Sequence, residues 1–196
     1  MQSDTAAAIL GGGAGSRIGG RKALVMLEGE PLVAHVARSL RASAGQLALV
    51  GDAEAAGAIH ADALSDPANF PAGPLSGVCA ALEWAARGKA AFVAIAPCDT
   101  PLLTPDVMAE LREAVATGVN VACAETQDGP QPLISVWRTS IAPWLRNELA
   151  GGHPSVRDVL TRIGFRAVRF AEADVFLNVN TPEDLQRAQA IIRARR

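Results

Sequence analysis

The hydrophobic positions of this chain form short continuous runs, separated by longer segments in which apolar residues recur with helical spacing. The runs predict strands at residues 6–10, 47–50, 91–96, 119–123 and 133–137. They lack the polar alternation of a half-exposed strand, which is typical of strands covered on both faces. Helical spacing occurs at residues 31–40, 75–86, 105–116, 141–149, 155–163 and 182–192. Alternating strands and helices predict an α/β fold: a three-layer α/β/α sandwich, Rossmann-like, with a mostly parallel central sheet.

Two segments refine this prediction. The last helix has a clear start signal, because Thr181 can cap it, Pro182 suits its first position and Asp184 lies where a capping box needs an acidic residue. Residues 53–73 mix Ala, Pro and Asp without a period, so we expect short elements and an exposed loop there. No linker divides the chain, and residues 1–196 are predicted to form a single domain.

Composition excludes several classes of protein. Of 196 residues, 49% are hydrophobic and 19% charged, which supports a packed core and excludes a disordered chain. The net charge of -2 argues against a general nucleic-acid binder, because such proteins carry an excess of basic residues. The chain has no uninterrupted apolar stretch of about 18 residues, so a membrane span is not expected. No positively charged segment precedes the first apolar run, so a secretory signal is not expected either. The three cysteines form no CxxC pair, so neither a disulfide framework nor a zinc cluster is expected. A cytoplasmic location is expected.

Polar segments follow the predicted strands. In open α/β sheets, ligands bind beyond the carboxyl ends of the strands. The first strand is followed by GGGAGSRIGGRK at residues 11–22, and the strand at 91–96 by PCDTP at 97–101. A further apolar stretch at 175–177, taken as strand-like, runs into NVNTP at 178–182. We therefore expect a ligand site where these three segments meet.

The glycine-rich segment has the chemistry of an anion site. Glycines expose backbone N–H groups to a ligand, and Arg17 and Lys22 can both reach phosphate oxygens. Two standard motifs do not fit. A P-loop needs Ser or Thr after its Lys, but Ala23 follows Lys22. A dinucleotide fingerprint needs a third glycine where Ser16 or Ile18 stands. A flexible loop with two solvated cations is the alternative.

A carboxylate and two amides complete the predicted site. Asp99 lies between prolines that restrict its backbone, and a carboxylate there suits Mg²⁺, which prefers hard oxygen ligands shared with phosphates. A turn or helix-cap role is the alternative. Asn178 and Asn180 face the same side of an extended chain, where amides can donate to a phosphate or supply a carbonyl oxygen to a metal. An Asx turn is the alternative there.

The glycine-rich segment fits the pattern L-x-G-G-x-x-x-R-I-G-x-x-K. This resembles the signature loop of nucleotidyltransferases that move a nucleoside monophosphate from an NTP to an acceptor phosphate. Within that superfamily the chain resembles the molybdenum cofactor guanylyltransferase family. The resemblance is carried by four further segments at residues 28–32, 71–77, 97–101 and 178–185.

The resemblance implies an activity. GMP would pass from GTP to the terminal phosphate of molybdenum-molybdopterin, by Mg²⁺-dependent in-line attack on the α-phosphate. Molybdopterin guanine dinucleotide and pyrophosphate would form, and the product could pass through transient contacts to molybdoenzymes or their chaperones.

The resemblance also implies roles for residues. The catalytic set comprises Arg17, Lys22 and Asp99, with Asp99 as the metal ligand. Asn178 and Asn180 would bind the pterin acceptor. Where relatives often carry Asn after the second strand, this chain has Gly51 and Asp52, so Asp52 could replace that contact. The nucleotide-binding set comprises Leu10, Gly11, Gly12, Gly13, Lys22, Asp66, Gly77 and Asp99.

Other functions remain open from the sequence. The same chemistry could use CTP with the same pterin, or a sugar or polyol phosphate as acceptor. A non-catalytic cofactor carrier and a nucleotide-binding regulatory domain are alternatives of another class. Lys22 and Asp99 together favour an enzyme, because binding alone does not require a metal carboxylate at the α-phosphate.

Overall fold

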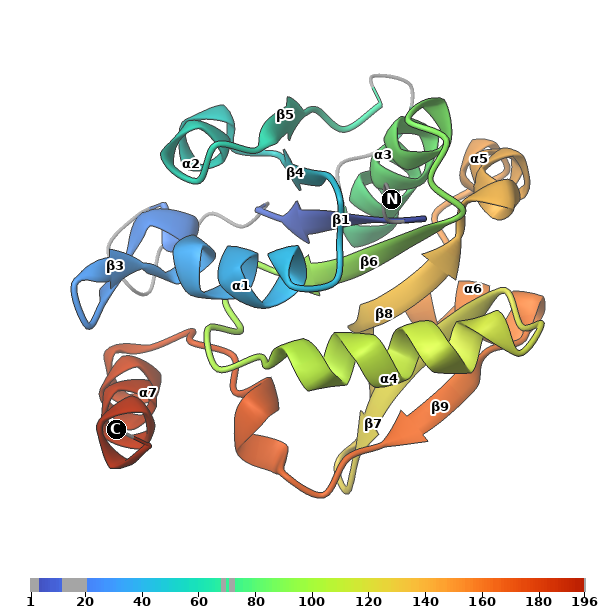
Figure 1. Cartoon of the computed structure of the whole chain (residues 1–196). Coiled ribbons are helices and arrows are strands. Elements are labelled where there is room, and N and C mark those ends of the chain that lie inside the picture. The colour runs from blue at the N-terminus through green and yellow to red at the C-terminus, as the bar shows by residue number, and fades with distance from the viewer. Residues whose placement is uncertain (1–3, 12–20, 68–69, 71–72, 196) are drawn as a thin grey trace.

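A computed structural model describes residues 4–11, 21–67, 70 and 73–195. Its centre is a seven-stranded sheet in the order β5-β4-β1-β6-β8-β7-β9 (Figure 1). Every neighbouring pair is parallel except those made by β8, which is antiparallel to both β6 and β7. The mostly parallel sheet is therefore confirmed. The strands are β1 (Thr5–Leu10), β4 (Leu47–Val50), β5 (Asp62–Leu64), β6 (Phe92–Pro97), β7 (Val121–Thr126), β8 (Gly129–Arg138) and β9 (Arg166–Arg169).

Helices cover both faces of the sheet, which confirms the three-layer sandwich (Figure 1). One face carries α1 (Leu32–Arg41), α2 (Ala53–Ala58) and α4 (Pro105–Ala116). The other carries α3 (Pro74–Arg87), α5 (Ala142–Ala150) and α6 (Val156–Ile163). Strand β1 supplies both cores, because Ile9 packs into the first and Ala8 into the second. A strand buried on both faces needs apolar residues at every position, as the sequence pattern indicated.

A third apolar cluster holds the C-terminal helix. Helix α7 (Pro182–Ala194) packs against the small hairpin of β2 (Met26–Leu27) and β3 (Glu30–Pro31), with Leu27 and Ala188 fully buried. The predicted capping box of Thr181 and Asp184 is present. It fixes the point at which the chain enters this helix.

Two local features differ from the sequence pattern, and a third agrees with it. Strand β9 was not predicted, because half of it is arginine and its residues are mostly exposed at the sheet edge. Residues 175–177 do not form a strand: a 3-10 helix, η3 (Ala173–Phe176), occupies most of this stretch. The segment 53–73 does contain short elements, namely α2 and β5.

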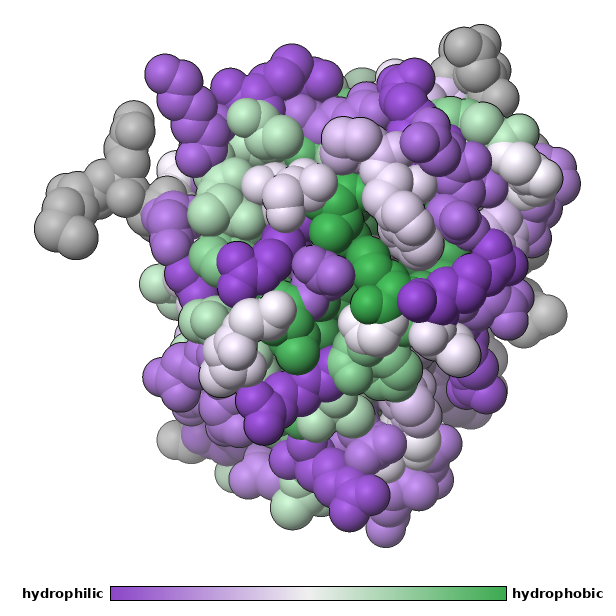
Figure 2. All heavy atoms as spheres, turned by 90° about the vertical axis from the view of Figure 1, so that its right-hand side faces the viewer, coloured by the Kyte–Doolittle hydropathy of each residue, from purple (hydrophilic) through white to green (hydrophobic). Residues whose placement is uncertain are grey.

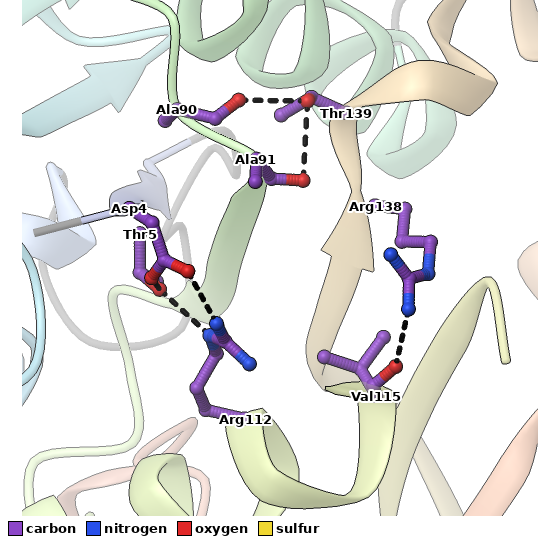
Figure 3. Close-up of polar contacts among 8 residues, drawn as sticks. All are labelled: Asp4, Thr5, Ala90, Ala91, Arg112, Val115, Arg138 and Thr139. Carbon is purple, nitrogen blue, oxygen red and sulfur yellow. Dashed lines mark hydrogen bonds and ion pairs between the residues drawn. The ribbon is translucent and has the colours of Figure 1, made fainter. Parts of the chain in front are cut away.

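At the edge where the parallel strands begin, polar groups bind one another (Figure 3). Arg112 of α4 donates to Asp4 Oδ2 at 2.6 Å and to Thr5 Oγ1 at 3.0 Å. Thr139, just after β8, donates to the carbonyl of Ala90 at 2.7 Å. The surface at this end is mostly hydrophilic around a small apolar centre (Figure 2). No helix in the described ranges has the length and apolar character needed to cross a membrane.

Candidate active site

A cavity of about 540 Å³ opens at the opposite edge, where the parallel strands end. Segments that are distant in sequence form its walls: the ends of β1, β4 and β6, the start of α3, the first half of β8 and the segment before α7. Its lining residues are Leu10, Lys22, Val50, Gly51, Asp66, Gly73, Pro74, Gly77, Pro97, Cys98, Asp99, Gln131, Pro132, Leu133, Ile134 and Asn178. Residues from all three predicted segments, among them Lys22, Asp99 and Asn178, therefore line one cavity.

Three of the predicted residues contact one another, and two of them, Lys22 and Asp99, line this cavity. Lys22 opens a short 3-10 helix, η1 (Lys22–Leu24), and its ammonium forms an ion pair with Asp99 Oδ2. The same Nζ donates a hydrogen bond to Asn180 Oδ1. The Lys22 and Asp99 side chains are only 13% and 15% exposed, so the two charges are largely shielded from water. A cation, a carboxylate and an amide thus converge from three separate segments.

Backbone contacts hold Asp99 in place. It lies directly after β6, and its carbonyl accepts a hydrogen bond from the N–H of Val179 at 2.8 Å. The N–H of Cys98 donates to the carbonyl of Leu10 at 3.1 Å, and Thr100 Oγ1 donates to that of Pro97 at 3.0 Å. These bonds join the end of β1, the loop after β6 and the segment before α7. The hydrogen bond between the Val179 N–H and the Asp99 carbonyl brings the asparagine segment to the site, and no strand at 175–177 does so.

The asparagine segment is fixed from its other side by α7. One oxygen of the Asp184 carboxylate accepts from the N–H groups of Asn180 and Thr181, each at 2.9 Å. Thr181 Oγ1 accepts from the Asp184 N–H at 3.1 Å. The helix cap therefore uses Thr181 and Asp184, and the Asn180 side chain is left to bind Lys22. This differs from an Asx turn made by the asparagines.

The second oxygen of Asp99 fits a bound cation. Asp99 Oδ1 is buried and has no hydrogen-bond partner among the described residues. A buried carboxylate oxygen without a partner is costly, and a hard cation in the cavity would satisfy it. The described residues contain no group of three or more His, Cys, Asp and Glu that could hold a metal. A single carboxylate such as Asp99 is the kind of protein ligand that Mg²⁺ takes beside substrate phosphates.

Asp66 and Gly77 lie on the β4 side of the cavity. Burial raises the pKa of the Asp66 carboxyl above its usual value. A Cβ on Gly77 would approach Leu10 Cδ2 to 3.0 Å and Asp66 Oδ1 to 3.7 Å, so a larger residue would push into the cavity wall. Gly11 is constrained more tightly, because a Cβ there would lie 2.8 Å from Leu49 Cδ2. Both glycines keep this wall close to the sheet.

Several predictions have other outcomes. Arg17, Gly12 and Gly13 lie outside the described residues. Asp52 caps α2, accepting from the N–H groups of its residues 54 and 55 at 3.1 and 3.0 Å, so its carboxylate is used within the fold. Cys98 lines the cavity, but burial raises the pKa of its thiol to about 12, which leaves it protonated and a poor nucleophile at neutral pH.

Sequence reasoning missed the wall formed by β8. Gln131, Pro132, Leu133 and Ile134 all line the cavity. The prolines at 130 and 132 were an available signal, because proline inside a strand marks an edge or a bulge.

Comparisons with known proteins identify the family of this chain. The family model described as MobA-like NTP transferase domain matches residues 7–187. The chain belongs to the MobA-like NTP transferase family. Within it, a molybdenum cofactor guanylyltransferase of Cereibacter sphaeroides is 38% identical over 190 residues, covering 94% of this chain and 95% of that protein. One of Pseudomonas putida is 37% identical, covering 91% and 94%. The resemblance read from the motifs is confirmed, and the chain is a nucleotidyltransferase.

Solved structures agree with this family. Molybdopterin-guanine dinucleotide biosynthesis protein A from Archaeoglobus fulgidus superposes with a TM-score of 0.79 at 27% identity, covering 96% of this chain and 98% of that one. CMP:2-keto-3-deoxy-manno-octonic acid synthetase complexed with CTP superposes with a TM-score of 0.73 at 15% identity, covering all of both chains. At that identity the likeness shows the fold alone.

Proposed function

We propose that this MobA-like nucleotidyltransferase transfers GMP from GTP to the terminal phosphate of molybdenum-molybdopterin, giving molybdopterin guanine dinucleotide and pyrophosphate. The observation that carries the proposal is the contact of Lys22 with both Asp99 and Asn180 at the carboxyl edge of the sheet, where Lys22 and Asp99 line the cavity. The names of the relatives support the choice of GTP and of the pterin acceptor.

The reaction is a phosphoryl-centred displacement. An oxygen of the acceptor phosphate forms a bond to the α-phosphorus, and the bond from that phosphorus to the β-phosphate oxygen breaks. The attacking phosphate is already anionic at neutral pH, so no general base is required. Catalysis then consists of positioning and charge neutralisation. A lysine and a carboxylate without a histidine partner are sufficient for this chemistry.

Each predicted residue has a place in this scheme. Lys22, Arg17 and the amides of residues 11–13 would hold the triphosphate and neutralise the departing pyrophosphate. Asp99 would hold Mg²⁺, and when bound this ion supplies neutralisation of phosphate charge. The shielded setting of Lys22 strengthens its attraction to a phosphate oxygen.

The two substrates would bind on different sides of Asp99. The nucleotide wall would comprise Leu10 and Gly77, which line the cavity, and Gly11 next to Leu10 in the chain. The Asp66 carboxylate would accept from hydroxyl or amino groups of the nucleoside. Asn178 lines the cavity. Asn180 accepts a hydrogen bond from Lys22 through its side-chain oxygen, so the NH₂ group of Asn180 can donate to the acceptor. We further propose one domain over residues 1–196, a cytoplasmic location, and transient product transfer to molybdoenzymes or their chaperones.

Pyrophosphate release tests this proposal. It should be measured with GTP and with CTP, each in the presence and absence of molybdopterin. We expect release only when GTP and molybdopterin are both present. Faster release with CTP would replace the assignment by CMP transfer to the same pterin. Pterin binding without pyrophosphate release from either nucleotide would favour a cofactor carrier.

A further inference from the structure

Strand β8 contains a large irregularity beside the cavity. In its pairing with β7, Cys123 lies opposite Ser135, whereas the next residue, Ala124, lies opposite Gln131. One step along β7 therefore corresponds to four along β8, and residues 132–134 leave the ladder. We call residues 132–134 the β8 bulge. Bulges of this kind occur next to active sites, where they redirect side chains.

The β8 bulge is a fixed part of the fold. Ser135 Oγ donates to the carbonyl of Pro132 at 3.0 Å, and Trp137 Nε1 donates to Ser135 Oγ at 2.7 Å. Ser135 and Trp137 are fully buried. Ile134 packs into one core and Leu133 against the other. The bulge is thus anchored on both faces of the sheet.

The direction of β8 places the bulge at the reaction centre. Because β8 runs antiparallel to β6, its beginning lies at the edge where β6 ends and Asp99 follows. The β8 bulge and Gln131 line the cavity there. The opposite wall comes from β1, β4 and α3, on the other side of β6. Asp99 therefore lies between two walls of different composition.

We propose that Gln131 and the β8 bulge form the wall that receives the acceptor, with the Gln131 amide binding the hydrogen-bonding edge of its pterin ring. This inference rests on the proposed function. The nucleotide residues Leu10 and Gly77 occupy the opposite wall, and in-line attack on the α-phosphorus needs the acceptor phosphate in space that neither the nucleoside nor the departing pyrophosphate fills.

The chemistry of this wall suits a flat, polar-edged ring. Pro132 and Leu133 are partly buried and offer apolar surface to a ring face. Gln131 is also partly buried, and no hydrogen bond of its side chain occurs in the described part of the chain. Its amide donates and accepts, which matches the ring amide and amino group along the edge of a pterin.

Initial rates of a Gln131→Ala variant test this assignment. Molybdopterin should be varied at saturating GTP, and GTP at saturating molybdopterin. We expect the KM for molybdopterin to rise about tenfold, as for loss of one hydrogen bond, while the KM for GTP stays unchanged. Leu133→Ala should shift the same constant. Gln127→Ala is the matched control, because Gln127 is exposed in the turn between β7 and β8 and does not line the cavity.

Either a rise in the KM for GTP or no change in both constants would overturn the assignment. A binding measurement distinguishes failure of this acceptor-wall assignment from failure of the proposed function. If the wild-type protein releases no pyrophosphate, bound molybdopterin can be quantified by its fluorescence after oxidation. A tenfold weaker retention by Gln131→Ala than by Gln127→Ala then still supports the acceptor wall, and equal retention overturns it.

Discussion

At the scale of single residues, the pairing of Lys22 with Asp99 is the central feature of the site. Two opposite charges, mostly removed from water, are tolerated because each offsets the desolvation of the other. Asp99 still has a buried oxygen without a partner among the described residues. The pair is therefore suited to rearrange when a cation and phosphates enter.

Replacing Lys22 should affect the reaction strongly. We expect Lys22→Ala to lower pyrophosphate release by on the order of 10²-fold or more, as for loss of a group that stabilises charge in the transition state. Arg21→Ala is the control, because the neighbouring Arg21 is 59% exposed and pairs with Glu54 outside the cavity. Full turnover in Lys22→Ala, with normal folding by circular dichroism, would contradict the assigned role.

Asp66 should show a conflict between function and stability. Because burial raises the folded-state pKa of Asp66 above the ordinary aspartate value of 3.8, its ionisation destabilises the fold as pH rises from 3.8 through that raised value. We expect Asp66→Asn to be more stable than the wild type at neutral pH, by about 1 kcal/mol or less. The difference should vanish near pH 3.8 and below, where the wild-type carboxyl is protonated in both states. Urea unfolding at several pH values measures this.

The Asp66→Asn variant should also bind GTP more weakly, because the charged hydrogen-bond acceptor at residue 66 is lost. Titration calorimetry with GTP checks this. An Asp66→Asn protein that is less stable at neutral pH, yet binds GTP normally, would refute both statements.

At the scale of elements, two capping boxes of the same kind provide an internal comparison. Asp158 closes the box of α6 with Ser155, and Asp184 closes that of α7 with Thr181. Only Asp184 also binds the N–H of Asn180, whose side chain accepts from Lys22. That N–H is the main cause of the lowered pKa of Asp184, so its stabilisation is present above about pH 3.8 and lost as pH falls through the lower folded-state value.

Asp184→Ala and Asp158→Ala should therefore differ in activity. We expect both to lower the melting temperature by a similar small amount, roughly 2–4 °C. Only Asp184→Ala should also lower kcat, by several-fold. In that variant the Asn180 backbone loses the carboxylate that holds it, and the Asn180 side chain then no longer positions Lys22. Calorimetry and pyrophosphate release measure the two effects. Equal kcat values in both variants would show that α7 does not position the site.

The elements also show which parts of the structure the sequence could predict. A continuous apolar run identified β4, and helical spacing of apolar residues identified α4, both with their bounds, because each element buries a pattern that is local in the chain. Strand β9 has no such pattern, since it is an exposed edge with two arginines. The β8 bulge depends on how Cys123 and Ala124 pair across the sheet. Pairing between strands is not written in either strand alone.

At the scale of the whole molecule, the alternation of strands and helices was sufficient to predict the three layers and the edge where the site lies. The contacts inside the site were not predictable, because Lys22, Asp99 and Asn180 are brought together by packing between distant segments. The role of α7 illustrates this. Its start signal was legible, whereas its tie to Asp99 through Val179 depends on the folded chain.

The most direct test of the catalytic centre is a comparison of Asp99→Asn with the wild type. Pyrophosphate release from GTP should be measured with molybdopterin, and Mn²⁺ binding should be followed by electron paramagnetic resonance with GTP present. The expected result is loss of release by on the order of 10²-fold or more, together with weaker Mn²⁺ binding and an intact fold by circular dichroism. Undiminished release and unchanged Mn²⁺ binding in Asp99→Asn would contradict the assignment of this cavity as the active site.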